Sequence, residues 1–375
     1  MPLKRGRIFF FGSLLIGCGI AVGLVLGEIG LRVFHTEAVL TLPHSVYHHT
    51  RPPDWTGRWR SNQGEFDQRV SFNRLGLRGS LPGDSDDRKK ILVLGDSMIE
   101  ALQVSEEETF CGQLEDNIEG DYSILNAGIG GYSPILMLLR LPELLKEFGP
   151  EIVLVALFPN DLEEELVYRK IGAANASRRV EAVPAPVLGS RAGRIQTVLF
   201  RHLAIWRLVS RSTRQETIVP NHKIDPSSPP SNVVYPFREG WTPVEKEAWS
   251  AVFTSLGEIQ MLCRDAGIRV VLLLVPPGQQ VSLDVWKSGK QLMGYGPGDW
   301  VESETFQKEA LLRARRIDLE AIDLLPSFKD HPNPTSLYFD HDGHWTAEGN
   351  AFAAEKVGEF LRNYQGDPGK PESSD

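Results

Sequence analysis

The chain of 375 residues has few cysteines, namely Cys18, Cys111 and Cys263. Three cysteines, one of them inside an apolar run, are too few to build a disulfide framework. We therefore expect Cys111 and Cys263 to be small core residues of helices. Cysteine usage neither supports nor excludes an oxidising compartment.

The sequence also lacks an excess of positive charge. Lys and Arg total 40 against 49 Asp and Glu, which gives a formal net charge of −9. Proteins that bind nucleic acid present a basic face. The composition therefore favours no nucleic-acid partner, and no internal repeat is visible.

Long apolar runs are scarce, and only residues 8–27 are long enough to cross a bilayer without a charged side chain. Lys4, Arg5 and Arg7 precede this run, which favours a cytoplasmic N-terminus and an extracytoplasmic (periplasmic or extracellular) remainder of the chain. We expect a single-pass signal anchor in the cell membrane, with residues 1–7 cytoplasmic. Cleavage as a signal peptide, or lipoprotein processing at Cys18, is the alternative.

Beyond a juxtamembrane segment at 28–90, strand-like apolar runs alternate with helical stretches. This alternation is typical of βαβ units and predicts an α/β fold with a central parallel sheet of about five strands. The expected strands lie at 91–95, 122–126, 152–158 and 268–275, with a weaker one near 318–322, and the expected helices at 135–148, 243–266 and 347–363.

Residues 165–242 interrupt the alternation with several prolines and an apolar, basic helix around 194–212. We expect this insertion to cover the mouth of the active site or to form a partner surface. Its aromatic residues suit core packing or a sugar-binding surface. They are Trp206, Tyr235, Phe237 and Trp241. The tail at 365–375 contains no apolar side chain and is predicted to be disordered.

A buried strand ends in Gly95-Asp96-Ser97 and is followed by the start of a helix. A serine at the carboxyl end of a central parallel strand lies where open α/β sheets place their chemistry. Ser97 is therefore a candidate nucleophile, and its own N–H a candidate oxyanion donor. The alternative is that Ser97 only caps the helix. We expect Asp96 to hold the turn through backbone hydrogen bonds.

A hydroxyl nucleophile requires a base and a group that orients the base. Asp342 and His344 lie in a loop just before the last expected helix, for which Thr346 is a plausible N-cap. A carboxylate two residues before a histidine can bind Nδ1–H and leave Nε2 for the serine proton. The alternative is a divalent metal site built on His341 and His344.

Two further strand ends carry candidate oxyanion donors. The turn at 128–131 contains Gly128, Gly130 and Gly131, whose backbone can approach a ligand closely, although a purely structural turn remains open. Asn160 follows the third buried strand and can aim its side-chain NH₂ at the same oxyanion, or cap the next helix.

The order of these blocks resembles the SGNH/GDSL hydrolase superfamily. The first block, Gly95-Asp96-Ser97, matches fully, and alignment of the second places the oxyanion glycine at Gly131, with Gly130 as a close alternative. The third block has Phe158 in place of the usual glycine, before Asn160-Asp161. The spacing of Asp342 and His344 is similar to the membrane-anchored, AlgX/AlgJ-like branch that acts on bacterial exopolysaccharide.

The resemblance implies a three-layer, flavodoxin-like hydrolase domain over 91–364, with Ser97, His344, Asp342, Gly131 and Asn160 as catalytic residues. It implies an esterase or O-acyltransferase for small acyl groups, chiefly acetyl, on a carbohydrate, without metal or cofactor. A lipase or lysophospholipase, and a non-catalytic glycan-binding or assembly subunit, are the alternatives. Hydrolysis or transfer, acyl length and oligomeric state stay open.

Overall fold

The computed structural model describes residues 2–34, 40–83, 86–118, 122–174, 179–211, 240–285, 287–292 and 303–363. The predicted disordered tail at 365–375 lies outside these residues. So do Tyr235, Phe237 and several prolines of the insertion.

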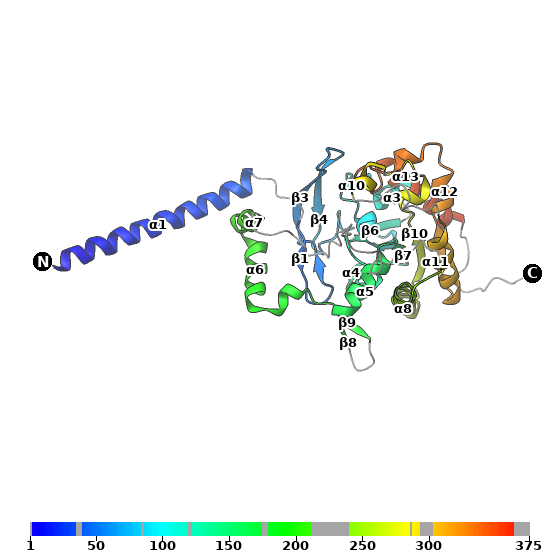
Figure 1. The fold of residues 1–375 in the computed structure, drawn as a ribbon, viewed down its shortest axis with the longest axis horizontal. Coiled ribbons are helices and arrows are strands. Elements are labelled where there is room, and N and C mark those ends of the chain that lie inside the picture. Colours follow the sequence, from blue (N-terminus) through cyan, green and yellow to red (C-terminus); the bar gives the residue numbers. More distant parts are fainter. Residues whose placement is uncertain are drawn as a thin grey trace, which may run out of the picture.

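A five-stranded parallel sheet forms the centre of the protein, in the order β11-β10-β7-β5-β6 (Figure 1). The predicted fold class and strand number are therefore confirmed. Strands covered on both faces bury side chains on both, which explains their continuous apolar sequences. The strands are β5 (Lys89–Gly95), β6 (Tyr122–Gly128), β7 (Ile152–Leu157), β10 (Arg269–Leu274) and β11 (Glu320–Asp323).

Helices cover both faces of the sheet and give the predicted three layers. Alternate residues of β5 point to opposite faces, so that Leu92 and Leu94 join one apolar cluster and Ile91 and Val93 the other. The first cluster includes side chains of α4 (Pro134–Phe148), α5 (Asp161–Ile171), α8 (Pro243–Asp265) and α11 (Thr305–Arg316). The second includes side chains of α2 (Ser97–Glu100), α3 (Phe110–Asn117), α9 (Gly278–Val281), α12 (Leu325–Lys329) and α13 (Ala347–Asn363).

The expected helices are confirmed to within a residue or two, and local capping explains their ends. Thr242 and Glu245 form a capping box at the start of α8, and Gly267 follows its end with φ +73°. Thr346 Oγ1 accepts the Gly349 N–H at 3.2 Å at the start of α13, as expected of an N-cap. Cys111 in α3 and Cys263 in α8 are buried, as predicted.

The helix α1 (Pro2–Phe34) is longer than the apolar run and extends away from the globular part (Figure 1). Within it, Phe10–Leu31 is long and apolar enough to cross a membrane, by length and composition. The large apolar side chains described along this stretch are exposed, among them Leu15 and Ile16.

The segment expected to be juxtamembrane forms two antiparallel pairs, β1 (Leu42–Pro43) with β2 (His49–Thr50) and β3 (Trp55–Arg60) with β4 (Asp67–Phe72). These strands stand beside the sheet in Figure 1, on the side toward α1. Val70 and Phe72 pack against Leu102, just after α2. Residues 40–83 therefore cover the carboxyl edge of the sheet.

The insertion differs from expectation in two respects. Its first residues belong to the core helix α5, and the single helix expected around 194–212 is two helices, α6 (Arg191–His202) and α7 (Ala204–Arg211), separated by the extended residue Leu203. Of these two helices, α6 contacts β1 and α7 contacts α1. The remaining short elements are β8 (Ala173–Ala174), β9 (Val180–Ala182), η1 (Pro186–Gly189), α10 (Lys287–Leu292) and η3 (Pro334–Leu337).

Candidate active site

Ser97 is the first residue of α2 and follows Asp96 at the carboxyl end of β5, an inner strand of the sheet. Asp96 is the N-cap of this helix, and its Oδ1 accepts the Met98 N–H at 2.9 Å, as expected for a residue that holds the turn. Gly95 is required by close packing, because a Cβ there would lie 2.4 Å from the Ile99 side chain. The tight strand-to-helix turn places the Ser97 N–H at the start of α2, where an anion is favoured.

His344 and Asp342 meet Ser97 from the loop before α13. His344 Nε2 lies 2.8 Å from Ser97 Oγ, and His344 Nδ1 lies 2.6 Å from Asp342 Oδ1. An ionised carboxylate only accepts hydrogen bonds, so Nδ1 carries the ring proton and Nε2 accepts from the Ser97 hydroxyl. The structure thus brings these three predicted residues into one hydrogen-bonded chain.

The electrostatics of this pair favour a charged histidine beside an ionised aspartate. Burial lowers the pKa of His344, but the neighbouring carboxylates, Asp342 above all, raise it to a net value above the ordinary 6.5. Burial likewise raises the pKa of Asp342, and the charge and hydrogen bond of His344 lower it to a net value below 3.8. Imidazolium formation is therefore stabilised, as a general base requires.

The loop that carries Asp342 and His344 is held by residues 40–83, which cover the carboxyl edge of the sheet and are called the N-terminal cover. The Glu65 carboxylate, between β3 and β4, accepts the N–H groups of His341 and Asp342 at 2.9 and 3.0 Å. His341 Nδ1 also lies 3.4 Å from Glu65. Asp340, the other acidic candidate, accepts from the backbone and hydroxyl of Ser288 instead. Of the two acidic candidates, only Asp342 contacts His344.

His341 and His344 have different partners, Glu65 for one and the Asp342–Ser97 chain for the other. Over the described ranges, no group of three or more His, Cys, Asp or Glu side chains is arranged to hold a metal ion. Both ring nitrogens of His344 are thus engaged in the hydrogen-bonded chain with Asp342 and Ser97.

The glycine turn distinguishes the two candidate oxyanion donors. The Gly130 N–H donates to Glu100 Oε2 at 2.9 Å and is already occupied. Gly131 has φ +79°, and its carbonyl accepts from the Tyr168 hydroxyl at 2.7 Å. Within the part of the chain that the structure describes, the Gly131 N–H has no acceptor. Gly128 serves close packing, since a Cβ there would lie 2.4 Å from the Glu100 nitrogen.

Asn160 precedes α5 but does not cap it through its side chain. Its Nδ2 instead donates to Glu164 Oε1 at 3.3 Å, and its Oδ1 is buried without a partner. One Nδ2 hydrogen is used in this bond, which leaves the second for another acceptor.

Three buried carboxyl groups lie close to Asn160, those of Asp96, Asp161 and Glu164. Asp96 Oδ2, Asp161 Oδ1 and Glu164 Oε2 are all buried without a hydrogen-bond partner in the described chain. Burial, followed by the mutual repulsion of the carboxylates, raises the pKa of Asp161 well above its ordinary value and that of Glu164 to about 8. A protonated Glu164 carboxyl is thus favoured next to Asn160 near neutral pH.

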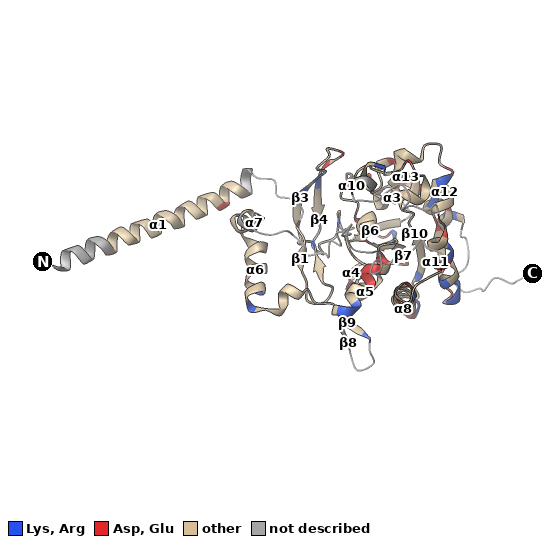
Figure 2. Cartoon of the chain, in the orientation of Figure 1, with Lys and Arg blue, Asp and Glu red and all other residues tan. Residues whose placement is uncertain are grey.

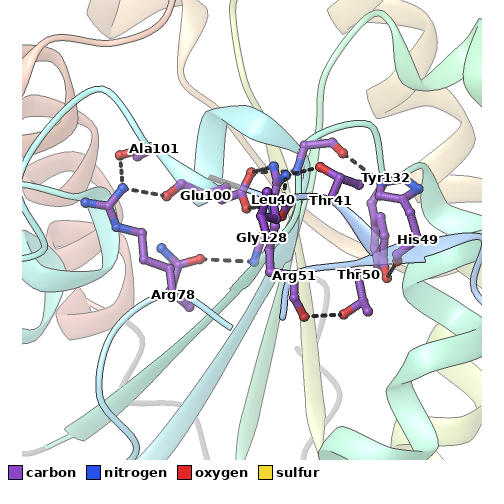
Figure 3. A network of polar contacts seen from close by, with 12 residues as sticks. Leu40, Thr41, His49, Thr50, Arg51, Arg78, Glu100, Ala101, Gly128 and Tyr132 are labelled. Atoms are coloured by element: carbon purple, nitrogen blue, oxygen red, sulfur yellow. Dashed lines mark hydrogen bonds and ion pairs between the residues drawn. The ribbon is translucent and has the colours of Figure 1, made fainter. Parts of the chain in front are cut away.

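A buried ion pair between Arg51 and Glu100 escaped the sequence analysis (Figure 3). Arg51 donates from Nε to Glu100 Oε1 at 2.6 Å and from Nη2 to Oε2 at 2.7 Å, and Arg51 Nη1 also bonds Thr41. Arg78 binds the other side of the same turn and donates to the carbonyls of Ala101 and Val104 at 2.5 and 2.6 Å. The only local signal was the position of Glu100 one helical turn after Ser97.

His49 is a further residue that the sequence did not single out, because it lies with His44 and His48 in a polar, proline-containing segment, a composition that favours a surface loop. It is fully buried, and its Nε2 donates to the Gly130 carbonyl at 2.9 Å (Figure 3 shows it beside Tyr132). Its Nδ1 therefore accepts from His48 Nδ1, 3.0 Å away. Burial lowers the pKa of His49 to about 3, so it stays neutral. The surface-loop interpretation of His48 and His49 was wrong.

Comparisons with known proteins match parts of this chain. Residues 239–374 match the family described as "SGNH hydrolase-like domain, acetyltransferase AlgX". Thioesterase 1/protease 1/lysophospholipase L1 of Escherichia coli strain K12 is 38% identical over 71 residues, which cover 19% of this chain and 34% of that protein. An arylesterase of Vibrio mimicus is 34% identical over 84 residues, 22% of this chain and 42% of that protein.

The match thus covers less than half the length of these curated relatives. Among solved structures, Est24, a carbohydrate acetylesterase from Sinorhizobium meliloti, has a TM-score of 0.39 and 12% identity, and the alignment covers 74% of this chain and 99% of that one. TesA has a TM-score of 0.38 and 16% identity, with 73% and 99% covered.

Proposed function

We propose that this chain is a serine esterase or O-acyltransferase. The premise is that it is a protein of the SGNH/GDSL superfamily with an AlgX-like carboxyl-terminal part. The observation that carries the proposal is the chain from Ser97 Oγ to His344 Nε2 at 2.8 Å and from Nδ1 to Asp342 at 2.6 Å. The position of Ser97 at the carboxyl end of β5, an inner parallel strand, adds support.

The mechanism follows from the hydrogen-bond directions. His344 Nε2 takes the hydroxyl proton as Ser97 Oγ attacks the ester carbonyl, and Asp342 stabilises the imidazolium. When the tetrahedral intermediate collapses, His344 returns that proton to the leaving alcohol. Water, or the hydroxyl of an acceptor, then attacks the acyl-serine with His344 again as base, and Ser97 is regenerated.

The negative oxygen of the tetrahedral intermediate needs donors that are already in place. The N–H groups of Ser97 and Gly131 and the Asn160 side chain are the proposed donors. Gly131 suits this role because its own carbonyl is held by Tyr168 and the preceding Gly130 by Glu100 and His49. A turn fixed on both sides loses little freedom when the oxyanion forms.

For the substrate we favour acetyl and other small acyl esters of a carbohydrate. The support is the acetyltransferase description of the family that matches residues 239–374, with the Asp342–His344 spacing. The long-acyl alternative has support in the lysophospholipase name of a relative that matches only 19% of this chain. Trp241 packs against Trp249 at 5.6 Å between ring centroids, so it serves the core rather than a sugar platform.

The proposed location is extracytoplasmic, with α1 as a single-pass anchor. Its support is the apolar stretch Phe10–Leu31 and the basic residues that precede it. An anchored domain would work beside both envelope glycans and lipids, so the substrate has to be decided by experiment.

Activity of the detergent-solubilised full chain on p-nitrophenyl esters of increasing chain length tests the proposal. We expect acetyl to be preferred, and acetyl transfer to a glycan acceptor would distinguish transfer from hydrolysis. Preference for acyl chains of lipid length would replace the acetyl-glycan proposal by the lipase alternative. Labelling by a fluorophosphonate that persisted after Ser97→Ala would remove Ser97 as nucleophile, and absence of labelling in the unchanged chain would favour a non-catalytic subunit.

A further inference from the structure

The helices α6 and α7 expose an apolar surface that no described part of the chain covers. Ile195, Val198, Leu203 and Leu208 are 51%, 57%, 40% and 50% exposed. Ile195 and Val198 are three residues apart and therefore share one side of α6. Single exposed apolar residues are ordinary, but a group on one amphipathic helix pair indicates a contact surface.

This surface is basic in an acidic protein. The whole chain has a net charge of −9, whereas residues 190–211 contain no Asp or Glu. Arg191 precedes Ile195 by four residues and Arg194 precedes Val198 by four, so each apolar side chain has an arginine on the adjacent turn. Figure 2 shows no acidic colour on α6. The arginines of this segment are Arg191, Arg194, Arg201, Arg207 and Arg211.

The helix pair is tied to the end of the apolar helix. The Glu28 carboxylate, within the membrane-length stretch Phe10–Leu31, accepts the N–H groups of Ala204 and Ile205 at 2.9 and 3.0 Å. The helix α7 also contacts the globular part, where the Arg207 guanidinium lies 5.1 Å from the Trp55 ring centroid. In Figure 1, α6 runs across the direction of α1.

We propose that α6 and α7 lie in the headgroup layer of the membrane that α1 crosses. Ile195, Val198 and Leu208 insert among the upper acyl methylenes, and Arg191, Arg194 and Arg201 bind anionic lipid phosphates. If α1 spans the bilayer, the membrane surface lies at the end of α1, and α6 runs across α1 at that end (Figure 1). This inference goes beyond the proposed activity and rests on the proposed anchoring alone.

The consequence is a fixed orientation of the catalytic domain. Glu28 joins α7 to α1, and α7 joins the β3–β4 pair through Trp55. The β1–β4 cover of the carboxyl edge therefore faces the membrane surface, and the domain does not turn freely on its anchor.

The test uses the full chain in vesicles of equimolar phosphatidylcholine and phosphatidylglycerol, with Cys18→Ser to remove the exposed thiol. The variants Val198→Cys and Leu208→Cys, in which Cys111 and Cys263 are buried and the introduced thiol is the exposed one, carry an environment-sensitive fluorophore. We expect blue-shifted emission and strong quenching by lipids with a nitroxide near the headgroup. Ile16→Cys, in the middle of α1, is the depth reference and should be quenched best by a nitroxide near the end of the acyl chain.

Matched controls come from apolar side chains of similar exposure on other helices. Met261 of α8 and Leu312 of α11 are 54% and 46% exposed. Probes at Met261→Cys and Leu312→Cys should be quenched by aqueous iodide and not by lipid nitroxides. Retained esterase activity shows that each labelled variant is folded.

The charge component is tested by Arg191→Glu, Arg194→Glu and Arg201→Glu combined, with Arg315→Glu and Arg316→Glu of α11 as the control. We expect the first set, and not the second, to reduce lipid quenching at Val198. If the Val198 probe were quenched equally in vesicles of phosphatidylcholine alone, the proposed binding of anionic lipid phosphates by the arginines would be wrong.

Three results would overturn the proposal or its premise separately. A Val198 probe that behaves like the Met261 probe would show that α6 is in water. A probe shielded from both iodide and lipid would show that another protein or a second copy covers the helix pair. An Ile16 probe without lipid quenching would instead contradict the anchoring by α1.

Discussion

Arg51 and Glu100 form a two-point ion pair beneath the catalytic turn, with Nε–Oε1 and Nη2–Oε2 distances of 2.6 and 2.7 Å. Their side chains are 9% and 1% exposed. Glu100 is one helical turn from Ser97 and also accepts the Gly130 N–H. The N-terminal cover is therefore joined to both the nucleophile turn and the oxyanion loop through a single carboxylate.

Glu100→Gln should destabilise the fold and slow the reaction. It leaves the buried Arg51 charge unpaired, which typically costs about 3–5 kcal/mol, and weakens the support of the Gly130 turn. We expect a lower Tm and a lower kcat with KM little changed. Glu147→Gln is the control, because its pair with Arg74 lies at the surface and contributes little. Equal stability of Glu100→Gln and the unchanged chain would contradict a structural role of the pair.

Asn160→Ala should retain the fold and lose turnover. Removal of one oxyanion donor costs on the order of 3 kcal/mol of transition-state stabilisation, or about two decades in kcat. Steady-state kinetics on an activated acetyl ester, with Tm as a check, measure this. Asn363→Ala, at the exposed end of α13, is a neutral comparison. A variant with unchanged kcat would remove Asn160 from the oxyanion hole.

Asp342→Asn should be far more damaging than Asp340→Asn. Of these two carboxylates, only Asp342 contacts His344, whereas Asp340 accepts from Ser288 in α10. Loss of the orienting carboxylate reduces kcat by about 10⁴-fold in a serine protease triad, and we expect a loss of several decades here. Asp340→Asn should stay near unchanged activity. The reverse ranking would transfer the orienting role to Asp340.

The value of kcat/KM should increase as the pH rises through the pKa of His344. Its imidazole must be neutral to accept the Ser97 proton, and Asp342 contributes most to raising the pKa above 6.5. The midpoint should therefore lie above 6.5 in the unchanged chain and shift lower in the residual activity of Asp342→Asn. The stability contributed by the charged histidine has the opposite sign. It is complete below pH 6.5 and is lost as pH rises through the raised pKa. A midpoint below 6.5 would contradict this assignment.

Glu164→Gln should make the protein more stable in alkaline solution. Burial raises the pKa of Glu164 to about 8, so the native state must ionise a buried carboxyl as pH rises above this value, whereas the unfolded chain ionises it near 4.5. A raised pKa contributes stability below the unfolded value and loses it through the folded one. We expect the Tm of Glu164→Gln to fall less than that of the unchanged chain between pH 4.5 and about pH 8, where the unfolded chain has ionised this carboxyl and the native state has not. Glu163→Gln, the neighbouring half-buried carboxylate on α5, is the control. Parallel Tm profiles for Glu164→Gln and the unchanged chain would exclude the buried charge as the cause.

The sequence by itself determined the sheet, the helices that cover it and the identity of the residues in the proton-transfer chain. Strands such as 152–157 and helices such as 243–265 have local patterns, since apolar periodicity and caps act between near neighbours. The position of Ser97 after β5 and the short spacing of Asp342 and His344 are local in the same sense. These parts could be predicted because nothing distant is needed to specify them.

Only the tertiary structure decided what supports the site and where the insertion lies. Arg51 and Glu100 are 49 residues apart, and Glu65 binds the loop of His341 and Asp342 across 276 residues or more. No local pattern relates such partners, because their pairing depends on how the N-terminal cover packs on the finished sheet. The single helix expected around 194–212 was divided for the same reason, since the carboxylate that starts α7 comes from Glu28. Hydrogen bonds of buried charges depend on the three-dimensional neighbourhood and not on spacing along the chain.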